Sequence, residues 1–408
     1  MKVLYFHQHF STPKYGGGIR SYEFAKKLKE RGHEVTMVCG GNKSFGLPET
    51  KKAGVTRGVM DGIDVIQILV PYDNSFGKIK RMMSFLKFAW AGIKIAFSEK
   101  YDVLFATSTP LTAGIPGIIV KLFKKIKFVF EVRDLWPDLL IAVGLKNPLV
   151  VKPLRFLERQ CYYKADACIG LSPGICEGIN NRSKKGQRIE LIPNGCDLNI
   201  FQPGNRENLK LDGIKPTDKV AVFTGAHGIA NGLDAVLDAA KVLKDRGRND
   251  IILVFIGNGN LKAGLMERAK SEGLDNCRFY APVPKYELSE IVCSSNIGLM
   301  TLKNIPEYYY GTSPNKFFDY IAAGIPVLNN YPGWLADMIK ENKCGIVVEP
   351  DNPEAFADGL IYLADHSEEC EKMGNNGRKL AETSFDRSGL GNQFVDFLED
   401  VCDKRNNH

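Results

Sequence analysis

The chain has 408 residues, of which 44% are hydrophobic and 25% are charged, so it is long enough for two folded domains with their own cores. Its ten cysteines are dispersed and include no C-x-x-C pair, which argues against a zinc site or a thioredoxin-like motif and fits a reducing cytosol. The chain opens on a strand-like segment and holds no run of about 18 apolar residues, so we expect neither a signal peptide nor a transmembrane span.

The net charge of +7 is unevenly distributed. Residues 1–200 carry 31 Lys and Arg against 17 Asp and Glu, whereas the remainder carries 23 against 30. A basic first half suggests an anionic partner. No nucleic-acid-binding motif accompanies this charge. We therefore expect a phospholipid surface or a lipid-linked diphosphate acceptor, and no nucleic acid.

Short β-branched or aromatic runs alternate with helical patterns in the first half of the chain. One such helix is predicted over Ile19–Arg31, ending at Gly32. This alternation is typical of an α/β fold with parallel sheets. We predict strands at Lys2–Phe6, Glu34–Cys39, Asp64–Ile68, Val103–Thr107, Lys127–Glu131, Ala167–Leu171 and Arg188–Ile192.

Three consecutive glycines, Gly16 to Gly18, lie between the first strand and the first helix. Glycines let a backbone approach a ligand closely and expose its N–H groups to an anion. The same residues also suit a plain flexible turn. The spacing does not match G-x-G-x-x-G, and no acidic residue follows the second strand, which lowers the case for a nicotinamide dinucleotide.

A basic and apolar segment covers residues 78–100 and reads KIKRMMSFLKFAWAGIKIAFSEK. We interpret it as an interfacial helix that contacts an anionic membrane, the alternative being a helix that covers the sheet with its lysine heads in water. The residues expected at the membrane are Lys78, Lys80, Arg81, Lys87, Trp90 and Lys94. Phe85 and Phe88 would add apolar contact if they face outward.

Residues 131–138 read EVRDLWPD and follow a buried strand, so they lie at its carboxyl end, where open α/β sheets bind ligands. Arg133 can hold a carboxylate or phosphate but cannot act as a general base. If a base is needed, Asp134 is the better candidate. The alternative is a structural ion pair within this loop.

Pro203, Gly204, Gly213 and Pro216 indicate an interdomain linker over residues 201–218. We accordingly predict a first Rossmann-like domain over 1–200, a second over 219–385, and a terminal helix over 386–408. The strands of the second domain are predicted at Val220–Thr224, Ile251–Ile256, Cys277–Tyr280, Ile297–Leu299, Pro326–Asn329 and Gly345–Val348.

Three loops at the strand ends of the second domain contain candidate ligand-binding residues. Gly225, His227 and Asn231 follow its first strand, and Gly257 follows the next. Val283 lies in the loop after the third. Glycines at such junctions also occur for packing alone, and a lone histidine is more often structural than functional.

The stretch from Thr312 to Val327 reads as a loop, a short helix and a buried strand. Pro314 suits the first turn of this helix, and Gly324 suits its end. Free N–H groups of the first turn, the positive end of the helix dipole and Lys316 together favour an anion such as a diphosphate. One turn further on, the Asp319 carboxylate could accept hydrogen bonds from a ribose diol.

This Pro314-Asn315-Lys316-x-x-Asp319-Tyr320 stretch resembles the donor-site signature of retaining glycosyltransferases of the GT-B fold, family 4, and in particular its fucosamine-transferase-like branch. The resemblance implies two Rossmann-like parallel-sheet domains that face a central cleft, with the last helix returning to the first domain. Many relatives have two glutamates with seven residues between them. Here the second position is Asp319 and the first is Gly311.

The resemblance also implies roles for the other loops. Gly17 and Gly18 would face the donor phosphates, and the loop at Val283 would hold uracil through backbone groups. Lys316 and His227, with the two glycines, would stabilise the departing diphosphate. Relatives often place an Arg and a Lys in the loop that here holds His227 and Asn231.

We therefore predict a retaining glycosyltransferase, peripheral on the inner face of the cell membrane. It would transfer a sugar from a nucleotide sugar, expected to be a UDP-sugar with an N-acetylated aminosugar as one candidate, to a lipid-linked acceptor of a surface polysaccharide. No bound metal and no cofactor are predicted. The alternatives are a UDP-sugar 2-epimerase of the same fold and a catalytically silent nucleotide-sugar-binding protein.

Overall fold

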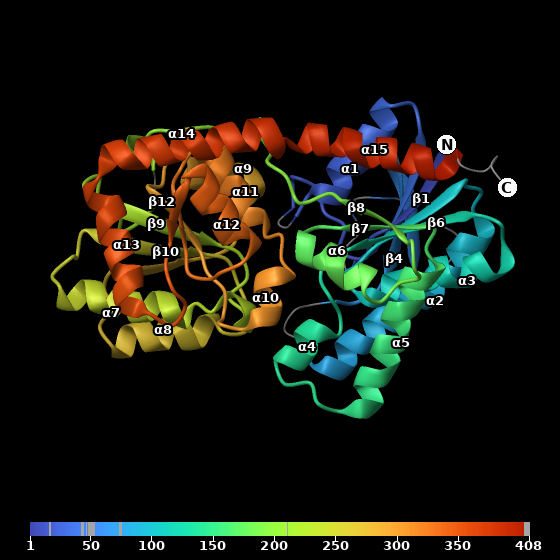
Figure 1. Ribbon diagram of the computed structural model, residues 1–408, viewed down its shortest axis with the longest axis horizontal. Helices are drawn as coiled ribbons and strands as arrows, with labels where there is room; N and C mark the ends of the chain where they lie inside the picture. Colours follow the sequence, from blue (N-terminus) through green and yellow to red (C-terminus); the bar gives the residue numbers. More distant parts are fainter. Residues whose placement is uncertain are drawn as a thin grey trace.

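The computed structural model describes residues 1–15, 18–41, 45, 47, 54–72, 76–209 and 211–403. The chain forms two α/β domains that lie side by side, and the helices of the C-terminal segment run along both (Figure 1). Each domain is built around one sheet with helices on both faces. The predicted α/β architecture is confirmed.

The first domain contains an eight-stranded sheet in the order β3-β4-β2-β1-β5-β6-β7-β8. Neighbouring strands are parallel except β3 and β4, which form an antiparallel hairpin. The strands are β1 (Lys2–Phe6), β2 (Glu34–Gly41), β3 (Val55–Met60), β4 (Ile63–Leu69), β5 (Val103–Thr107), β6 (Lys127–Val132), β7 (Ala167–Gly170) and β8 (Arg188–Leu191).

The hairpin strand β3 is absent from the prediction. Its sequence, VTRGVM, contains an arginine and a glycine, which weaken the strand signal. Asp61 and Gly62 join β3 to β4 and both have positive φ, 48° and 79°. An Asp-Gly pair of this conformation is the strongest short-range hairpin signal, so the turn residues could have revealed the strand.

Alternate residues of β1 enter two different cores, because successive strand side chains point to opposite faces. Leu4 and Phe6 pack against one helical layer, whereas Val3 and Tyr5 pack against the other. The first layer consists of α2 (Lys78–Ser98), α3 (Ile115–Phe123), α5 (Pro148–Lys164) and α6 (Pro173–Asn180). The second consists of α1 (Arg20–Glu30) and α15 (Arg387–Asp403).

The second domain contains a six-stranded parallel sheet in the order β11-β10-β9-β12-β13-β14. Its strands are β9 (Lys219–Thr224), β10 (Ile251–Ile256), β11 (Cys277–Tyr280), β12 (Ile297–Met300), β13 (Val327–Asn329) and β14 (Gly345–Val347). Its helices are α7 (Asp234–Asp245), α8 (Lys262–Ser271), α9 (Lys285–Cys293), α10 (Pro306–Tyr310), α11 (Asn315–Ala323), α12 (Trp334–Asn342), α13 (Pro353–Asp365) and α14 (Ser367–Ser384).

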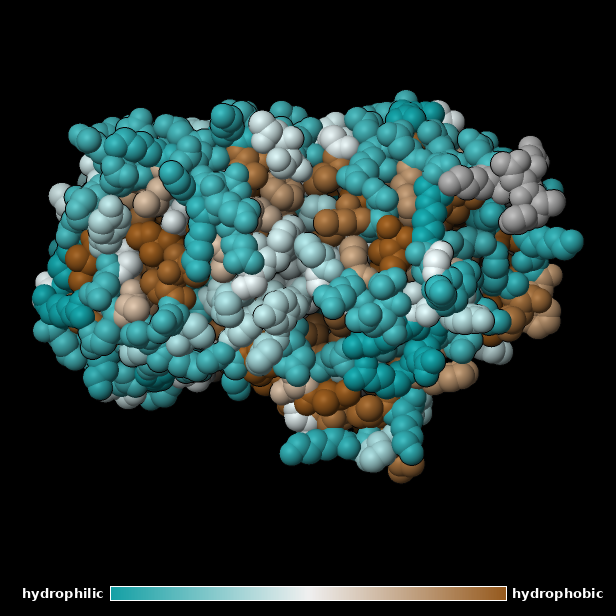
Figure 2. Space-filling model, viewed as in Figure 1, coloured by the Kyte–Doolittle hydropathy of each residue, from teal (hydrophilic) through white to brown (hydrophobic). Residues whose placement is uncertain are grey.

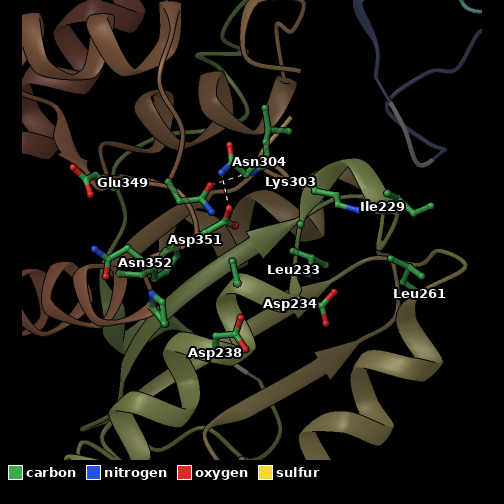
Figure 3. A pocket seen from close by; sticks show the side chains of 16 residues that line it. Ile229, Leu233, Asp234, Asp238, Leu261, Lys303, Asn304, Glu349, Asp351 and Asn352 are labelled. Atoms are coloured by element: carbon green, nitrogen blue, oxygen red, sulfur yellow. Dashed lines mark hydrogen bonds between the residues drawn. The ribbon is translucent and has the colours of Figure 1, made fainter. Parts of the chain in front are cut away.

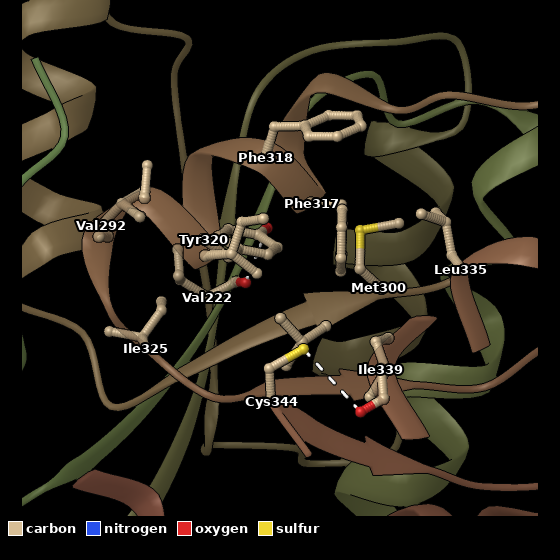
Figure 4. Packing of buried hydrophobic residues seen from close by; sticks show 14 of the residues in the cluster. Val222, Val292, Met300, Phe317, Phe318, Tyr320, Ile325, Leu335, Ile339 and Cys344 are labelled. Carbon is tan, nitrogen blue, oxygen red and sulfur yellow. Dashed lines mark hydrogen bonds between the residues drawn. The ribbon is translucent and has the colours of Figure 1, made fainter. Parts of the chain in front are cut away.

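Helix α11 is buried in the core of this domain. Phe317, Phe318 and Tyr320 pack among side chains of β9, β12 and α12 (Figure 4). The Tyr320 hydroxyl also donates to the Val222 carbonyl oxygen and accepts from the Thr224 N–H, each at 3.1 Å. These contacts fix the helix against β9, so its N-terminus has a defined position at the carboxyl edge of the sheet.

The described residues of the predicted interdomain linker, 201–209 and 211–218, pack on the second domain. Phe201 is fully buried in its core, and Tyr280 donates a hydrogen bond to the carbonyl oxygen of Asp212. The chain therefore crosses between the domains before residue 201. It crosses back between α14 and α15, and α15 packs on α1 (Figure 1).

Candidate functional site

Loops from both domains meet near the N-terminus of α11. Ser172, after β7, donates to the Tyr310 carbonyl oxygen at 3.0 Å. Asn194, after β8, bonds Ser313 through its backbone N–H and its side-chain amide, at 3.1 and 2.5 Å. A Cβ atom on Gly18 would lie 3.2 Å from Nδ2 of Asn315. The predicted glycine loop thus reaches the predicted donor helix, although Gly17 lies outside the described residues.

Helix α11 begins one residue later than predicted. Pro314 is the N-cap residue, with extended backbone angles of −73° and 127°, and not part of the first turn. The difference arises because Asn315 is the first residue to take helical geometry. Among the described residues no side chain caps this N-terminus, so its orphan N–H groups remain directed at the loop. Gly324 ends the helix with a φ of 69°, as predicted.

Lys316 reaches from this first turn toward the β9–α7 loop. Its Nζ atom donates a hydrogen bond to Oδ1 of Asn231 at 2.7 Å and lies 4.2 Å from the centroid of the Phe223 ring. The Asn231 amide is itself fixed by a 2.7 Å bond from Nδ2 to the Ala226 carbonyl oxygen. Burial lowers the pKa of Lys316 to about 7.

Gly225 and Gly257 are required by close packing between two loops. Their φ values are 134° and 149°, in the region that favours glycine. A Cβ atom on Gly257 would lie 1.9 Å from the Gly225 carbonyl oxygen, and one on Gly225 would lie 3.6 Å from Cε of Lys316. The two glycines therefore bring the β9–α7 and β10–α8 loops together beside Lys316.

His227, in the loop after β9, lies in an aromatic environment. Its ring is buried among Phe223, Phe255 and Phe279, with centroid distances of 6.0 to 6.3 Å. Neither ring nitrogen has a hydrogen-bond partner among the described residues. Burial, with the nearby lysines, lowers the pKa of His227 to about 4. The imidazole is therefore neutral, so any part that His227 plays in stabilising a diphosphate would rest on a ring N–H and not on a positive charge.

Asp319 lies one turn beyond Lys316 and is almost fully buried. Its Oδ1 atom is 3.4 Å from Nζ of Lys285, at the start of α9. Burial raises the pKa of the Asp319 carboxyl, while Lys285 opposes that rise. Val283, two residues before Lys285, packs partly buried against the core of the domain. The predicted ribose and base residues thus come from neighbouring elements.

On the first domain, Arg133 belongs to a buried ionic network at the end of β6. Its Nε atom donates to Thr107 Oγ1 at 2.8 Å and lies 3.2 Å from Glu131 Oε1, and its Nη2 atom donates to Ser21 Oγ at 2.8 Å. Glu131 is fully buried and also pairs with Arg20 at 2.8 Å. These contacts match the structural ion pair considered as the alternative for this loop.

Asp134 makes fewer contacts than its neighbour. Its Oδ2 atom accepts a 3.0 Å hydrogen bond from the Thr109 hydroxyl. Burial raises the pKa of this carboxyl, and that hydrogen bond and the Arg133 charge only partly offset the rise. A raised pKa makes a carboxylate a better proton acceptor, so the environment suits the role of base.

Two histidines after β1, His7 and His9, are further candidates that the sequence analysis does not name. The His9 ring lies 4.5 Å from the Tyr72 ring and 6.3 Å from the Phe85 ring, centroid to centroid. Burial lowers the pKa of His9 to about 4 and that of His7 well below its usual value. An H-x-H pair immediately after the first parallel strand was the available signal, because strand ends form the ligand-binding edge.

A pocket of about 370 Å³ opens elsewhere on the second domain, beyond β9, β12 and β14 (Figure 3). Asp234, Asp238, Glu349 and Asp351 line it together with a single lysine, Lys303. Carboxylates in such number oppose the binding of an anionic diphosphate. The α11 N-terminus is the better phosphate site.

The predicted membrane segment forms helix α2. Phe88 is buried in the core and Phe85 contacts His9, so neither faces outward as considered. Trp90 is 64% exposed, and Lys80, Lys87 and Lys94 are exposed on the same side, while Arg81 is half-buried. The side chain of Lys78 lies outside the described part of the structure. No helix in the described ranges is long and apolar enough to cross a bilayer.

The two domains match two family models. Residues 16–195 match the model described as Glycosyl transferase 4-like domain, and residues 205–380 match Glycosyl transferases group 1. The chain is similar to the putative colanic acid biosynthesis glycosyl transferase WcaI of Escherichia coli (strain K12). The two sequences are 22% identical, and the match covers 97% of this chain and 99% of WcaI.

Solved structures of glycosyltransferases share the fold over the whole chain. WaaG, described as a glycosyltransferase involved in lipopolysaccharide biosynthesis, superposes with a TM-score of 0.70 at 18% identity, covering 97% of this chain and 99% of its own. Anabaena Alr3699/HepE in complex with UDP-glucose gives a TM-score of 0.70 at 15% identity, covering 98% of this chain and 100% of its own. The predicted GT-B fold is confirmed.

Proposed function

Because the chain is a GT-B glycosyltransferase with a glycosyl transferase 4-like first domain and a group 1 second domain, we propose that it transfers a sugar from a UDP-sugar to a lipid-linked glycan during surface-polysaccharide synthesis. The names of WcaI and WaaG support this biosynthetic setting. The UDP-glucose bound to HepE supports the donor class.

The observation that carries the donor assignment is the position of Lys316. An uncapped helix N-terminus and a lysine whose hydrogen-bond partner is a neutral amide converge beside two glycine-rich loops. Fixed positive groups of this kind stabilise charge as it develops on a departing diphosphate. Asp319 then lies one helical turn away, where the ribose hydroxyls of the same nucleotide would donate to it.

We infer transfer with retention of configuration from the resemblance to family 4. The bond between the anomeric carbon and the diphosphate oxygen breaks, and the bond to the acceptor oxygen forms on the same face of the sugar. Lys316 and the α11 dipole hold the leaving group. Asp134 is the candidate to take the acceptor proton, since burial raises its pKa.

The similarity of the Pro314–Tyr320 stretch to the fucosamine-transferase-like branch leads us to place N-acetylated aminosugars first among the donors to be tested. Discrimination between sugars depends on a few hydroxyl contacts, since a site built to bond a hydroxyl rejects an analogue that lacks it. Gly311 stands where many relatives have a sugar-binding glutamate, so such contacts must come from other residues.

The protein is also proposed to bind an anionic membrane, where a lipid-linked acceptor would lie. Helix α2 contains no acidic residue, and its outward face bears a continuous apolar stripe between lysines spaced seven apart. The exposed apolar residues of α2 are Ile79, Met82, Met83, Leu86, Trp90 and Phe97, and the exposed lysines are Lys80, Lys87 and Lys94. An amphipathic basic face of this type binds the headgroup region of bilayers.

Helix α5 adds a second stripe in the same helical layer. Leu149, Phe156 and Tyr163 are exposed and alternate with Lys152 and Arg159 at helical spacing. Its one acid, Glu158, is buried and paired with Arg155 and Arg182. Figure 2 shows apolar side chains gathered on the surface where Figure 1 places α4 and α5. We propose that both stripes contact the inner leaflet on the cytoplasmic side.

A direct assay separates this function from its alternatives. The protein is incubated with radiolabelled UDP-sugars, with and without membranes that carry lipid-linked sugars. Label that moves to lipid only when membranes are present supports the proposal. A new UDP-sugar formed without membranes indicates a 2-epimerase, and binding without turnover indicates a silent nucleotide-sugar-binding protein.

A further inference from the structure

Four buried charged side chains lie in a row of ion pairs. This row leads from the proposed ribose site to the place where the polypeptide crosses between the domains. Asp319, Lys285, Asp197 and Arg387 are each less than a tenth exposed. Nζ of Lys285 lies 3.4 Å from Asp319 Oδ1 and 2.6 Å from Asp197 Oδ2. Asp197 also pairs with Arg387, whose Nη2 atom lies 3.2 Å from Asp197 Oδ2. Negative and positive charges alternate along this row.

The four residues come from four different segments. Asp319 is on α11, Lys285 begins α9, and Arg387 begins α15. Asp197 belongs to the first crossing between the domains, which is paired with the second crossing by backbone hydrogen bonds. The Cys196 N–H donates to the Phe385 carbonyl oxygen at 2.6 Å, and the Arg387 N–H donates to the Cys196 carbonyl oxygen at 3.1 Å.

The Lys285 ammonium group lies at different distances from the Asp197 and Asp319 carboxylates. It is closer to Asp197, and together with Arg387 it overcomes the effect of burial, so the pKa of Asp197 is lowered. For Asp319 the effect of burial prevails, so its pKa is raised. Lys285 and Arg387 oppose that rise, while the Asp197 charge adds to it.

Three further titratable groups that interact with Asp319 are uncharged. Cys196, Cys293 and Tyr320 each interact with it, and burial raises the pKa of all three. Lys285 is therefore the charged group that contacts Asp319 directly within the described residues. Without it, a carboxylate would be buried with no ion partner in contact, which is strongly unfavourable.

We propose that Lys285 is a positioning residue that holds the Asp319 carboxylate for the ribose of the donor, and that Asp197 anchors Lys285 to the paired interdomain crossings. This proposal rests on the proposed donor site. The lysine does not contact the donor; it keeps the carboxylate charged and fixed when ribose hydroxyls donate to it. The anchor links the geometry of the proposed donor site to the paired interdomain crossings.

The test is UDP affinity measured by calorimetry between about pH 5.5 and 8.5 for the whole protein and its variants. Loss of affinity on the acid side reports protonation of Asp319, and the titration of UDP itself cancels in comparisons between variants. We expect Lys285→Met to weaken UDP binding about tenfold at neutral pH and to move the acid midpoint to higher pH, since the opposing cation is lost. Lys285→Arg should keep most of the affinity.

Asp197→Asn should shift the acid midpoint of UDP affinity in the direction opposite to Lys285→Met. Removing this negative charge should move the acid midpoint to lower pH, because the Asp197 charge raises the pKa of Asp319. A merely structural loss would not shift the midpoint in opposite directions for the two variants. Lys340→Met, at an exposed site on α12, is the matched control and should leave the midpoint unchanged.

Thermal unfolding identifies variants that fail to fold, and one folded variant of the two is sufficient, because its midpoint is compared with that of the wild type. If neither folds, Lys285→Gln and Asp197→Ser at lower temperature replace them with the same expected signs. Wild-type midpoints in a folded variant, or shifts in the same direction, would overturn the proposal. If Asp319→Ala itself binds UDP normally, the ribose assignment fails, which is a distinct outcome.

Discussion

Nζ of Lys316 donates a hydrogen bond to Oδ1 of Asn231 at 2.7 Å, and this contact joins the donor helix α11 to the loop after β9. The partner is a neutral amide, so the lysine is held in place without its charge being neutralised. Relatives that place an Arg and a Lys in this loop would divide the stabilisation of the diphosphate among several side chains. Here the Lys316 ammonium group and the helix dipole are expected to do it.

Lys316→Ala should lower transfer at least about tenfold with the fold intact, because the variant loses a fixed cation at the leaving diphosphate. The measurement is initial rate with saturating lipid acceptor, beside a thermal unfolding curve. Asn231→Leu should give a smaller loss, since the ammonium remains but is no longer held. Near-normal turnover of folded Lys316→Ala would remove this residue from the donor site.

The affinity for UDP should fall as pH rises through about 7. The pKa of Lys316 is about 7 in the free protein, so the ammonium form that binds a diphosphate predominates below that pH and is lost above it. Each pH unit above the midpoint should cost up to about tenfold in affinity. Lys316→Arg should bind with little pH dependence on this alkaline side, because a guanidinium stays charged. A wild-type affinity that is flat from neutral to alkaline pH would contradict the assignment.

Asp319→Ala should weaken UDP binding by about 1.5–3 kcal/mol, the range for losing hydrogen bonds to a charged group. Asp319→Glu should be tolerated better, because the resembling family usually has glutamate there. Calorimetry with UDP and with uracil alone separates ribose contacts from base contacts. Unchanged UDP affinity in the alanine variant would count against the ribose role.

Gly18→Val should raise the KM for the donor and should change the melting temperature little. A Cβ atom at this position would lie 3.2 Å from Nδ2 of Asn315, so a larger side chain would push the glycine loop away from α11. Asn315→Ala in the same chain should restore part of the loss by making room. Gly77→Ala, where no atom lies within 4 Å of the new Cβ, is the control. Donor kinetics equal to wild type would show that this approach is not needed for turnover.

Replacing Lys80, Lys87 and Lys94 by Gln should release the protein from anionic liposomes. Each basic residue gains about 1 kcal/mol near an anionic surface, and salt screens this attraction. Trp90→Ala should weaken binding further by removing apolar contact. Folding stability should change little, since exposed charges contribute little to it.

Co-sedimentation at low and high salt measures this effect. Lys340 and Lys372, which are exposed on the second domain, provide a control pair that should not matter when changed to Gln. Retention of the triple variant on liposomes, or no binding by the wild type at low salt, would reduce α2 to a helix that covers the sheet.

Most strands and the helices α1, α2 and α11 were predictable because their signals are local. A fully buried parallel strand such as β10 is a continuous apolar run, and its bounds were predicted without error. Gly324 was placed correctly because only a left-handed residue ends a helix in that way. The hairpin strand β3 was missed, since it lies at the edge of its sheet and carries polar residues.

The functional residues divide along the same line. The amino-acid sequence by itself determined the α/β class, the sheet edges where loops collect, and the motif that contains Lys316 and Asp319. Only the tertiary structure decided which of these side chains are buried and which charged partners they contact. It buried His227 among phenylalanines, tied Arg133 to Glu131, and placed Lys285 between two aspartates far away in the chain. Ionisation and reactivity depend on burial and on partners from other segments, which no local pattern contains.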